Sequence, residues 1–183
     1  MKTLANWSAC LAVVAVGMLA GCSKTVKPPD VAVNIRTALD QAGFKKVSVD
    51  QDRDKGVVTL SGNVAADADK SQAETIATSL AAGQVVSNQI AVVPIGNESA
   101  AKDVNADLDA GIDKNLDAAL ILGKLHKGVT YDVKSGVVTL NGEVNSQSTR
   151  AQVEQAATTV PNVQQVVNEL QVNDQKASSG LTQ

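Results

Sequence analysis

The chain repeats one pattern of apolar and polar positions at an offset of 80 residues. The segment 56–64, GVVTLSGNV, recurs at 136–144 as GVVTLNGEV. In the first copy, Val58, Leu60 and Val64 fall on one face of an extended chain, which predicts a strand with one buried face. The offset continues through Gln72 and Gln152, Glu74 and Glu154, Asn88 and Asn168, and Val92 and Val172. The chain therefore contains two copies of one structural unit.

Each copy predicts a helix, two strands, a second helix and a third strand. In the first copy, apolar residues at helical spacing follow Asp30, a predicted N-cap, and stop at Gly43. Residues 50–56 form the predicted turn between the first two strands. The predicted elements are helix 31–42, a strand from Val47, strand 57–64, helix 67–82 and strand 85–93, and then helix 109–123, strands 129–133 and 137–144, helix 146–160 and strand 163–172.

This element order predicts an α+β fold with two tandem α-β-β-α-β units. In each unit, two amphipathic helices cover the apolar face of a three-stranded sheet. Gly56 and Gly136 begin the repeated motif, while Gly62 and Gly142 stand where a missing side chain permits a bulge or a close backbone approach. Units of about 65 residues are marginally stable alone, so we expect contact between them. The predicted divisions are a signal peptide at 1–21, a tether at 22–29, units at 30–94 and 104–173, a linker at 95–103 and a disordered tail at 174–183.

The first residues have the layout of a secretory signal. Lys2 precedes an apolar run over 9–20, which is shorter than the roughly 20 residues of a spanning helix. The run ends in Leu-Ala-Gly before Cys22, which resembles the lipobox of bacterial lipoproteins. The resemblance implies cleavage before Cys22 and a diacylglycerol on its sulfur. The alternative is a plain secretory signal with a chance cysteine.

The residues after Cys22 and the use of cysteine fit this anchor. The short polar segment 22–29 contains two prolines and predicts a stiff tether. Cys10 lies in the part that would be removed, so the mature chain would have no disulfide. In enteric bacteria, a serine after the lipidated cysteine goes with export to the outer membrane, and Ser23 therefore favours that location.

Composition and motifs argue against nucleic-acid binding and catalysis. The net charge is −3 and aromatics make up 2% of the chain, whereas a nucleic-acid binder is expected to be basic and richer in aromatics. His126 is the single histidine, and no nucleotide-binding or nucleophile motif is present. The acidic run over 50–54 lacks the glycine and glutamate of a calcium loop, so it predicts a solvated turn. We therefore predict no enzyme activity, cofactor or metal site.

The repeated motif resembles the BON domain (bacterial osmotically inducible and nodulation domain). The resemblance rests on the sequence Gly-Val-Val-Thr-Leu-Ser/Asn-Gly-x-Val, an Ala-rich helix, and Val-x-Asn-x-Ile/Leu-x-Val, found twice. It implies modules that contact phospholipid or other envelope components. With the lipobox, it also resembles the dual-BON outer-membrane lipoproteins, which are linked to outer-membrane integrity. In that group, the first helix of the second unit is the part associated with anionic phospholipid.

The helix over 108–125 carries more apolar residues than one buried face needs. Its predicted core face consists of Leu108, Ile112, Leu116, Ala119, Leu120 and Gly123. The predicted phospholipid contacts are Ile121, Leu122, Lys124, Leu125, His126 and Lys127, because apolar residues followed by cations suit an anionic lipid surface. Alternatively, Leu125 enters the core, or Ile121 and Leu122 pack against the first unit. The acidic Asp107, Asp109, Asp113 and Asp117 would repel anionic headgroups, so only the end of the helix favours them.

The sequence thus favours a non-enzymatic, lipid-anchored protein that faces the periplasm, at the outer membrane. Its expected partner is membrane phospholipid, and its expected role is to support envelope integrity or stress tolerance. The alternative is a scaffold that binds another envelope protein without recognising lipid, through the exposed edge of a small sheet.

Overall fold

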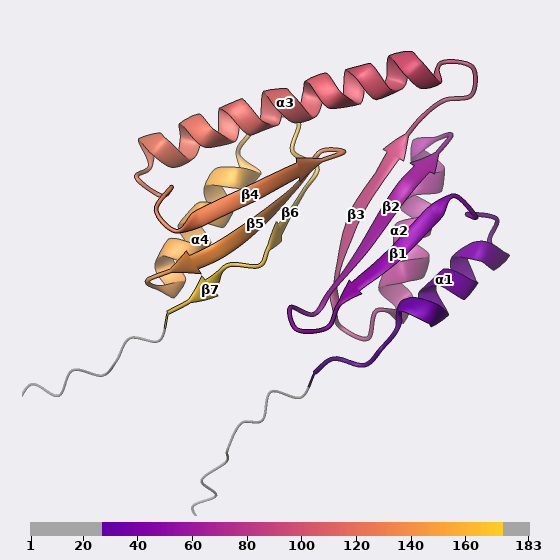
Figure 1. Cartoon of the computed structure of the whole chain (residues 1–183), viewed down its shortest axis with the longest axis horizontal. Helices are drawn as coiled ribbons and strands as arrows, with labels where there is room; N and C mark the ends of the chain where they lie inside the picture. The colour runs from indigo at the N-terminus through magenta and orange to yellow at the C-terminus, as the bar shows by residue number, and fades with distance from the viewer. Residues whose placement is uncertain (1–26, 174–183) are drawn as a thin grey trace, which may run out of the picture.

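The computed structural model describes residues 27–173, in which two α+β units share one order of elements (Figure 1). The first unit contains α1 (Ala32–Gln41), β1 (Val47–Asp52), β2 (Val57–Val64), α2 (Asp67–Leu80) and β3 (Val85–Val92). The second contains α3 (Glu98–Leu122), β4 (Val129–Lys134), β5 (Val137–Val144), α4 (Gln147–Thr158), β6 (Gln165–Asn168) and β7 (Gln171–Val172). The predicted signal peptide, Cys22 and the C-terminal tail lie outside the described residues.

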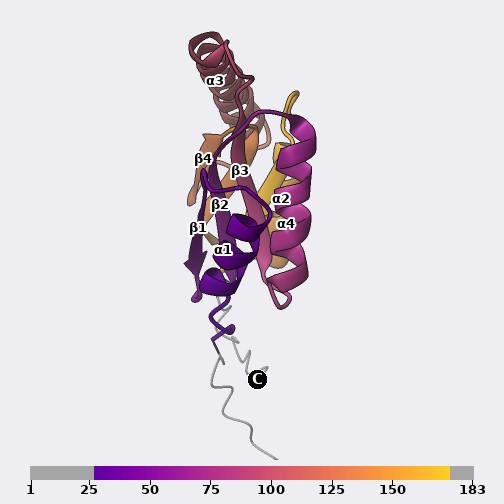
Figure 2. The same ribbon diagram turned by 90° about the vertical axis from the view of Figure 1, so that its right-hand side faces the viewer.

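Both sheets have the same topology, which confirms the predicted fold class. In the first unit, β1 pairs with β2 in antiparallel orientation and β3 joins β2 in parallel after the crossover through α2. In the second, β4 pairs with β5 in the same way, and β6 and β7 both lie parallel to β5. In the second unit, β6 and β7 therefore share the place that β3 has in the first, with a break between them at residues 169–170. The two views place α2 and α4 on the same side of the sheets (Figures 1 and 2).

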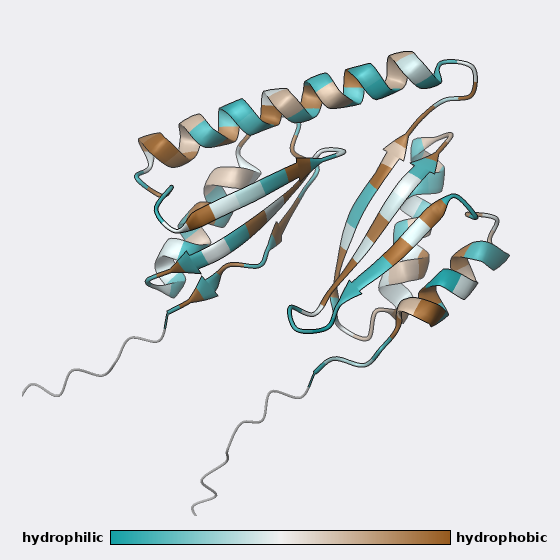
Figure 3. Cartoon of the chain, viewed as in Figure 1, coloured by the Kyte–Doolittle hydropathy of each residue, from teal (hydrophilic) through white to brown (hydrophobic). Residues whose placement is uncertain are grey.

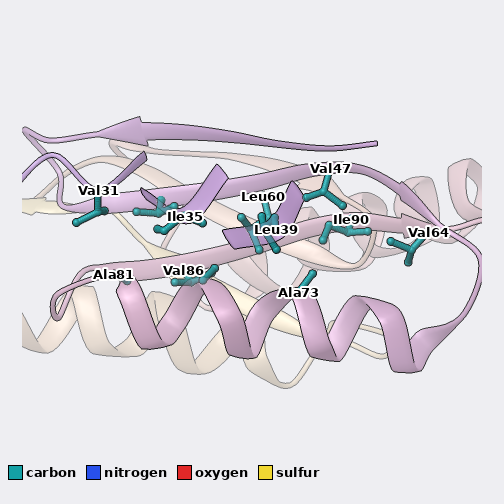
Figure 4. Close-up of a cluster of buried hydrophobic side chains, with 12 residues drawn as sticks. Val31, Ile35, Leu39, Val47, Leu60, Val64, Ala73, Ala81, Val86 and Ile90 are labelled. Atoms are coloured by element: carbon teal, nitrogen blue, oxygen red, sulfur yellow. The ribbon is translucent and has the colours of Figure 1, made fainter. Parts of the chain in front are cut away.

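Alternating apolar residues on each sheet pack against the helices and form one core per unit (Figure 3). Val58 and Leu60 of β2 are fully buried, and Val138 and Leu140 of β5 occupy the same places in the second copy. The core of the first unit is drawn in Figure 4; it includes Val31, Ile35, Leu39, Val47, Leu60, Val64, Ala73, Ala77, Val86 and Ile90. The period of the strands therefore determines which side the helices cover.

Gly62 and Gly142 lie at equivalent points where two backbone segments meet. Their φ angles are +113° and +115°, a backbone conformation that residues other than glycine rarely adopt. A Cβ on Gly62 would overlap the carbonyl oxygen of Lys46, and one on Gly142 would overlap that of Gly128. The repeated glycine thus permits a close backbone approach between paired strands.

The start of α1 is capped from a distant part of the chain, and the predicted N-cap Asp30 is wrong. The N-cap position is Val31, which has no side chain that can accept a hydrogen bond. Oε1 of Gln51 in β1 instead accepts the N–H groups of Val31 and Ala32, at 3.0 and 3.3 Å. These are two of the amide groups that a helix start leaves without partners.

Replacing Gln51 with alanine is expected to lower the free energy of unfolding by about 1 kcal/mol, because two N–H groups at the start of α1 lose their acceptor. Urea denaturation followed by circular dichroism measures the change. Gln41→Ala, an exposed substitution at the end of the same helix, should stay within about 0.5 kcal/mol of the parent. Equal effects of the two substitutions would contradict the capping role.

Helix α3 extends well into the segment predicted as a linker. The linker was expected at 95–103, but α3 begins at Glu98 and runs for 25 residues. Its N-terminal part lies beside the end of β3, and its C-terminal part covers the second unit (Figure 1). The carboxylate of Asp109 accepts the N–H groups of Ser135 and Gly136, at 2.8 and 2.9 Å, and so fixes the β4–β5 turn beneath the helix.

The two units contact each other along β3 and β6, which run in opposite directions (Figure 1). Gln165 bridges them, since its Oε1 accepts the N–H of Asn88 at 3.0 Å and its Nε2 donates to the carbonyl of Val86 at 2.7 Å. One side-chain amide thus replaces a neighbouring strand at this point on the edge of β3. A small apolar cluster of Val57, Val137 and Val167 lies in the same contact. The expected contact between the units is therefore present.

Candidate functional site

The last turn of α3 exposes two large apolar side chains. Ile112, Leu116 and Leu120 recur every four residues and are almost completely buried in the second core, so they define the inward face of the helix. Ile121 and Leu122 follow that stripe and point away from it, with 52% and 84% of their surface exposed. The alternative in which both pack against the first unit is therefore wrong.

Three cationic or titratable side chains follow directly. Lys124, His126 and Lys127 are all exposed. Together with Ile121 and Leu122 they form a surface that we call the α3 tip. It lies at the end of α3 farthest from the first unit (Figure 1). The tip therefore presents apolar and cationic side chains to solvent, and none of its five residues belongs to the second core.

Lys124 has a left-handed backbone conformation with φ +55°. It follows Gly123, and its N–H donates to the carbonyl of Ile121 at 3.0 Å as the helix ends. In the first unit, Gly43 follows α1 at the same structural position with φ +93°, which glycine adopts without strain. A lysine costs roughly 1 kcal/mol more than glycine in this conformation. The second unit thus carries a lysine where glycine would be more stable, and such strain is often found at functional sites.

Leu125 does not belong to this surface, which corrects the predicted set of contacts. Its side chain is half-buried and packs against the second core, and its N–H donates to the carbonyl of Leu120 at 2.8 Å. Phe44 occupies the equivalent position in the first unit, with its N–H on the carbonyl of Leu39 at 2.9 Å. The third residue after the helix end therefore packs against the core in both copies.

A polar groove of about 580 Å³ adjoins the tip. Lys124 and Lys127 line it, and the other lining residues include Glu143, Asn145, Thr149 and Gln152. The sequence analysis did not identify these last four residues. Their only signal was position, since Glu143 and Asn145 stand at the end of the second motif copy and Thr149 and Gln152 lie in the first half of α4.

An equivalent groove of about 500 Å³ lies in the first unit, with Lys45 and Lys46 on its wall. Asp69 and Glu98 also line it, so its charges are balanced. The backbone N–H of Gly96 donates to the Glu98 carboxylate at 3.1 Å and lowers the pKa of Glu98, and nearby lysines lower it further. Glu98 is therefore ionised at neutral pH, and only the second groove carries a net positive charge.

The acidic residues of α3 lie before the tip rather than within it. Asp109 is occupied by the β4–β5 turn. Asp113 and Asp117 are exposed beside Tyr131, whose hydroxyl donates to the carbonyl of Asp113 at 3.3 Å. Burial raises the pKa of Tyr131, and the two carboxylates raise it further. The charge thus changes from negative on this part of α3 to positive in the residues that follow the helix.

Comparison with models of known protein families identifies the family of both units. The family model for the BON domain matches twice, at residues 29–94 and 105–174. The chain belongs to the BON domain family. BON domains are often associated with membrane or envelope proteins and are generally non-catalytic. The tandem BON organisation predicted from the repeat is confirmed.

No curated protein matches the chain. Among solved structures, it is similar to two structures of CdsD, a structural protein of the type III secretion system of Chlamydia trachomatis. Both are 14% identical with a TM-score of 0.33; one alignment covers 81% of this chain and 100% of that chain, and the other covers 79% and 93%. These TM-scores are too low to support a conclusion about fold or function.

Two further observations concern the described residues. Between residues 27 and 173, no helix has both the length and the apolar composition needed to cross a bilayer. Within the same range, no group of three or more His, Cys, Asp or Glu side chains is placed to hold a metal ion.

In the acidic turn of the first BON unit, Oδ1 of Asp52 accepts the N–H groups of Asp54 and Lys55, at 2.9 and 3.0 Å. That carboxylate therefore organises its own loop.

Proposed function

We propose that this protein is a lipid-anchored envelope protein whose second BON unit contacts anionic phospholipid through the α3 tip. The observation that carries the proposal is the exposure of Ile121 and Leu122 directly before Lys124 and Lys127. Cys22 supplies the anchor, and diacylglycerol with further acylation holds the chain durably at the membrane. The contact supports envelope integrity, and the outer membrane is the proposed location.

The energies of the tip are sufficient for a reversible contact. Each lysine near an anionic surface contributes about 1 kcal/mol, and each large aliphatic side chain moved from water into the interface contributes about 1.5–3 kcal/mol. Part of this free energy offsets the loss of motional freedom on binding. The sum supports a weak contact that an acyl anchor makes effective by keeping the tip near the bilayer.

Vesicle binding by the anchor-less fragment 23–183 tests the proposal directly. We expect it to co-sediment with phosphatidylglycerol vesicles at low salt and to dissociate as salt rises, because screening weakens the attraction of the lysines. Vesicles of phosphatidylcholine alone serve as the control. Absence of binding to phosphatidylglycerol at low salt would remove the lipid contact from the proposal.

Replacing Lys124 with glycine is expected to change stability and binding in opposite directions. The substitution relieves the left-handed strain and raises the free energy of unfolding by roughly 1 kcal/mol. It also removes one cation and weakens binding to phosphatidylglycerol vesicles several-fold. Urea denaturation and co-sedimentation measure the two effects. Lys45→Gly, at an exposed position of the first unit, should weaken binding less than Lys124→Gly, because it acts only through the net charge.

A second candidate function is attachment of another envelope protein to a sheet edge. β4 pairs with β5 along one side, and the strand pairs found in residues 27–173 leave its other side open. An extended segment of a partner can add a strand to such an edge. Crosslinking in cells separates the two functions, because Leu122→Asp should abolish lipid contact yet spare a partner held at β4.

A further inference from the structure

The loop between β1 and β2 differs from its counterpart in the second unit. Four residues, Arg53–Gly56, separate the strands of the first hairpin, whereas two residues, Ser135 and Gly136, separate those of the second. Two-residue turns are the commonest connection between hairpin strands. Asp109 holds the short turn, but the longer loop makes contacts in two other directions.

One of these directions is toward the second unit. Nζ of Lys55 donates to Oδ1 of Asn141 at 2.9 Å and forms an ion pair with the carboxylate of Glu169. The Glu169 side chain is only 9% exposed, so its charge is largely removed from water. A pair with one partner this buried contributes more than an exposed ion pair, and loss of the lysine leaves the carboxylate without a counter-charge. Lys55 therefore links the first hairpin to Glu169, which lies 114 residues later in the chain.

The other direction is toward the N-terminal segment. Nε of Arg53 donates to the carbonyl of Pro28 at 2.9 Å, and Asp54 forms an ion pair with Lys27. Nε2 of Gln51, just before the loop, donates to the carbonyl of Pro29 at 2.8 Å. The tether predicted over 22–29 is thus docked on the first unit from Lys27 onward. The five residue steps from Cys22 to Lys27 can span at most about 18 Å.

We infer that the Arg53–Gly56 loop is an orientation clamp, which holds the anchored N-terminal segment and the second BON unit in fixed positions on the first unit. The inference rests on the proposed function, because the anchor and the α3 tip give the orientation its purpose. The units meet through few apolar residues, so polar contacts determine their relative position: those at the loop, those at Gln165, and the hydrogen bond from Nζ of Lys70 to Oε1 of Gln164 at 2.9 Å. A fixed orientation lowers the entropic cost of binding, because the tip already faces the bilayer when the chain is anchored.

The first experiment measures the orientation of the units without lipid. Spin labels are carried by unnatural amino acids at Val33 in α1 and Ala151 in α4, both exposed, in the full chain in detergent. The parent should give one narrow distance distribution. Lys55→Met should broaden it, because the units can then rock about the contact at Gln165, whereas Lys45→Met should leave it narrow. A narrow and unshifted distribution for Lys55→Met would overturn the clamp.

The second experiment connects the clamp to the membrane. In the acylated full chain, Ile121→Trp places a reporter at the tip, and the single native tryptophan, Trp7, lies in the segment expected to be removed. On phosphatidylglycerol vesicles, the blue shift of tryptophan emission should fall by at least half with Lys55→Met, although the acyl chains still hold the protein on the vesicles. An unchanged shift contradicts the clamp. If the parent shows no blue shift, the proposed function is contradicted instead. The spin-label distances, which are measured without lipid, still test the clamp in that case.

Discussion

Replacing Gly142 with alanine is expected to destabilise the second BON unit by about 3 kcal/mol. The alanine would have to keep φ near +115°, and its Cβ would overlap the carbonyl oxygen of Gly128. That carbonyl belongs to the residue just before β4 and accepts the N–H of Glu143 at 2.9 Å, so it cannot move without breaking this hydrogen bond to β5. Urea unfolding followed by the fluorescence of Tyr131, the only tyrosine in the sequence, reports on this unit.

A matched substitution separates this conflict from the general effect of adding a methyl group. Gly111 lies within α3, its φ is not positive, and a Cβ there meets no other atom within 4 Å. Gly111→Ala should therefore stabilise the same unit by up to about 1 kcal/mol, because alanine favours the helix. Similar losses for Gly111→Ala and Gly142→Ala would contradict the explanation from close backbone approach.

Replacing Leu122 with aspartate is expected to reduce binding of the 23–183 fragment to phosphatidylglycerol vesicles at least about a hundredfold. The change removes the apolar side chain with 84% exposure at the tip, worth about 1.5–3 kcal/mol in the interface, and adds a charge that anionic headgroups repel by about 1 kcal/mol. Since Leu122 is outside the core, the free energy of unfolding should change by less than about 0.5 kcal/mol. Co-sedimentation at low salt and urea denaturation provide the two measurements.

Val33→Asp is the control for this loss of binding. Val33 is an exposed valine in α1, with 72% of its surface in solvent, and it is remote from the tip. Its replacement adds the same charge and removes a similar apolar surface. Binding should therefore fall by no more than a few-fold through the change in net charge. If Val33→Asp and Leu122→Asp weaken binding equally, the contact is not localised at the α3 tip.

The sequence determined the elements whose causes are local. The alternation in the first motif copy identified Val58, Leu60 and Val64 as one buried face, because a strand places every second side chain on one face, and the equivalent Val138, Leu140 and Val144 are buried too. β2 and β5 span the residues that the motif predicted, 57–64 and 137–144. The repeat itself gave two units of one topology. Each of these features depends on residues close together in the chain.

The sequence identified the candidate site only in part. Helical periodicity separated Ile121 and Leu122 from the stripe that ends in Leu120, and the exposed fractions agree with that separation. The same periodicity also put Leu125 on the outer face, because it assumed a helix that continues. α3 ends at Leu122, and the left-handed Lys124 turns the chain so that Leu125 returns to the core. A reversal of this kind changes the direction of every later side chain.

Only the tertiary structure decided the features that join distant segments. Gln51 caps a helix that begins 19 residues earlier in the chain, Gln165 bridges two sheets, and Lys55 reaches Glu169. The extension of α3 through the predicted linker had no signal in the apolar pattern either, since residues 98–103 carry no apolar stripe and all but Ala101 are exposed. The local pattern of a chain fixes which surfaces must be buried. The partner that buries each surface is chosen by the free energy of the whole fold, which no short window of sequence contains.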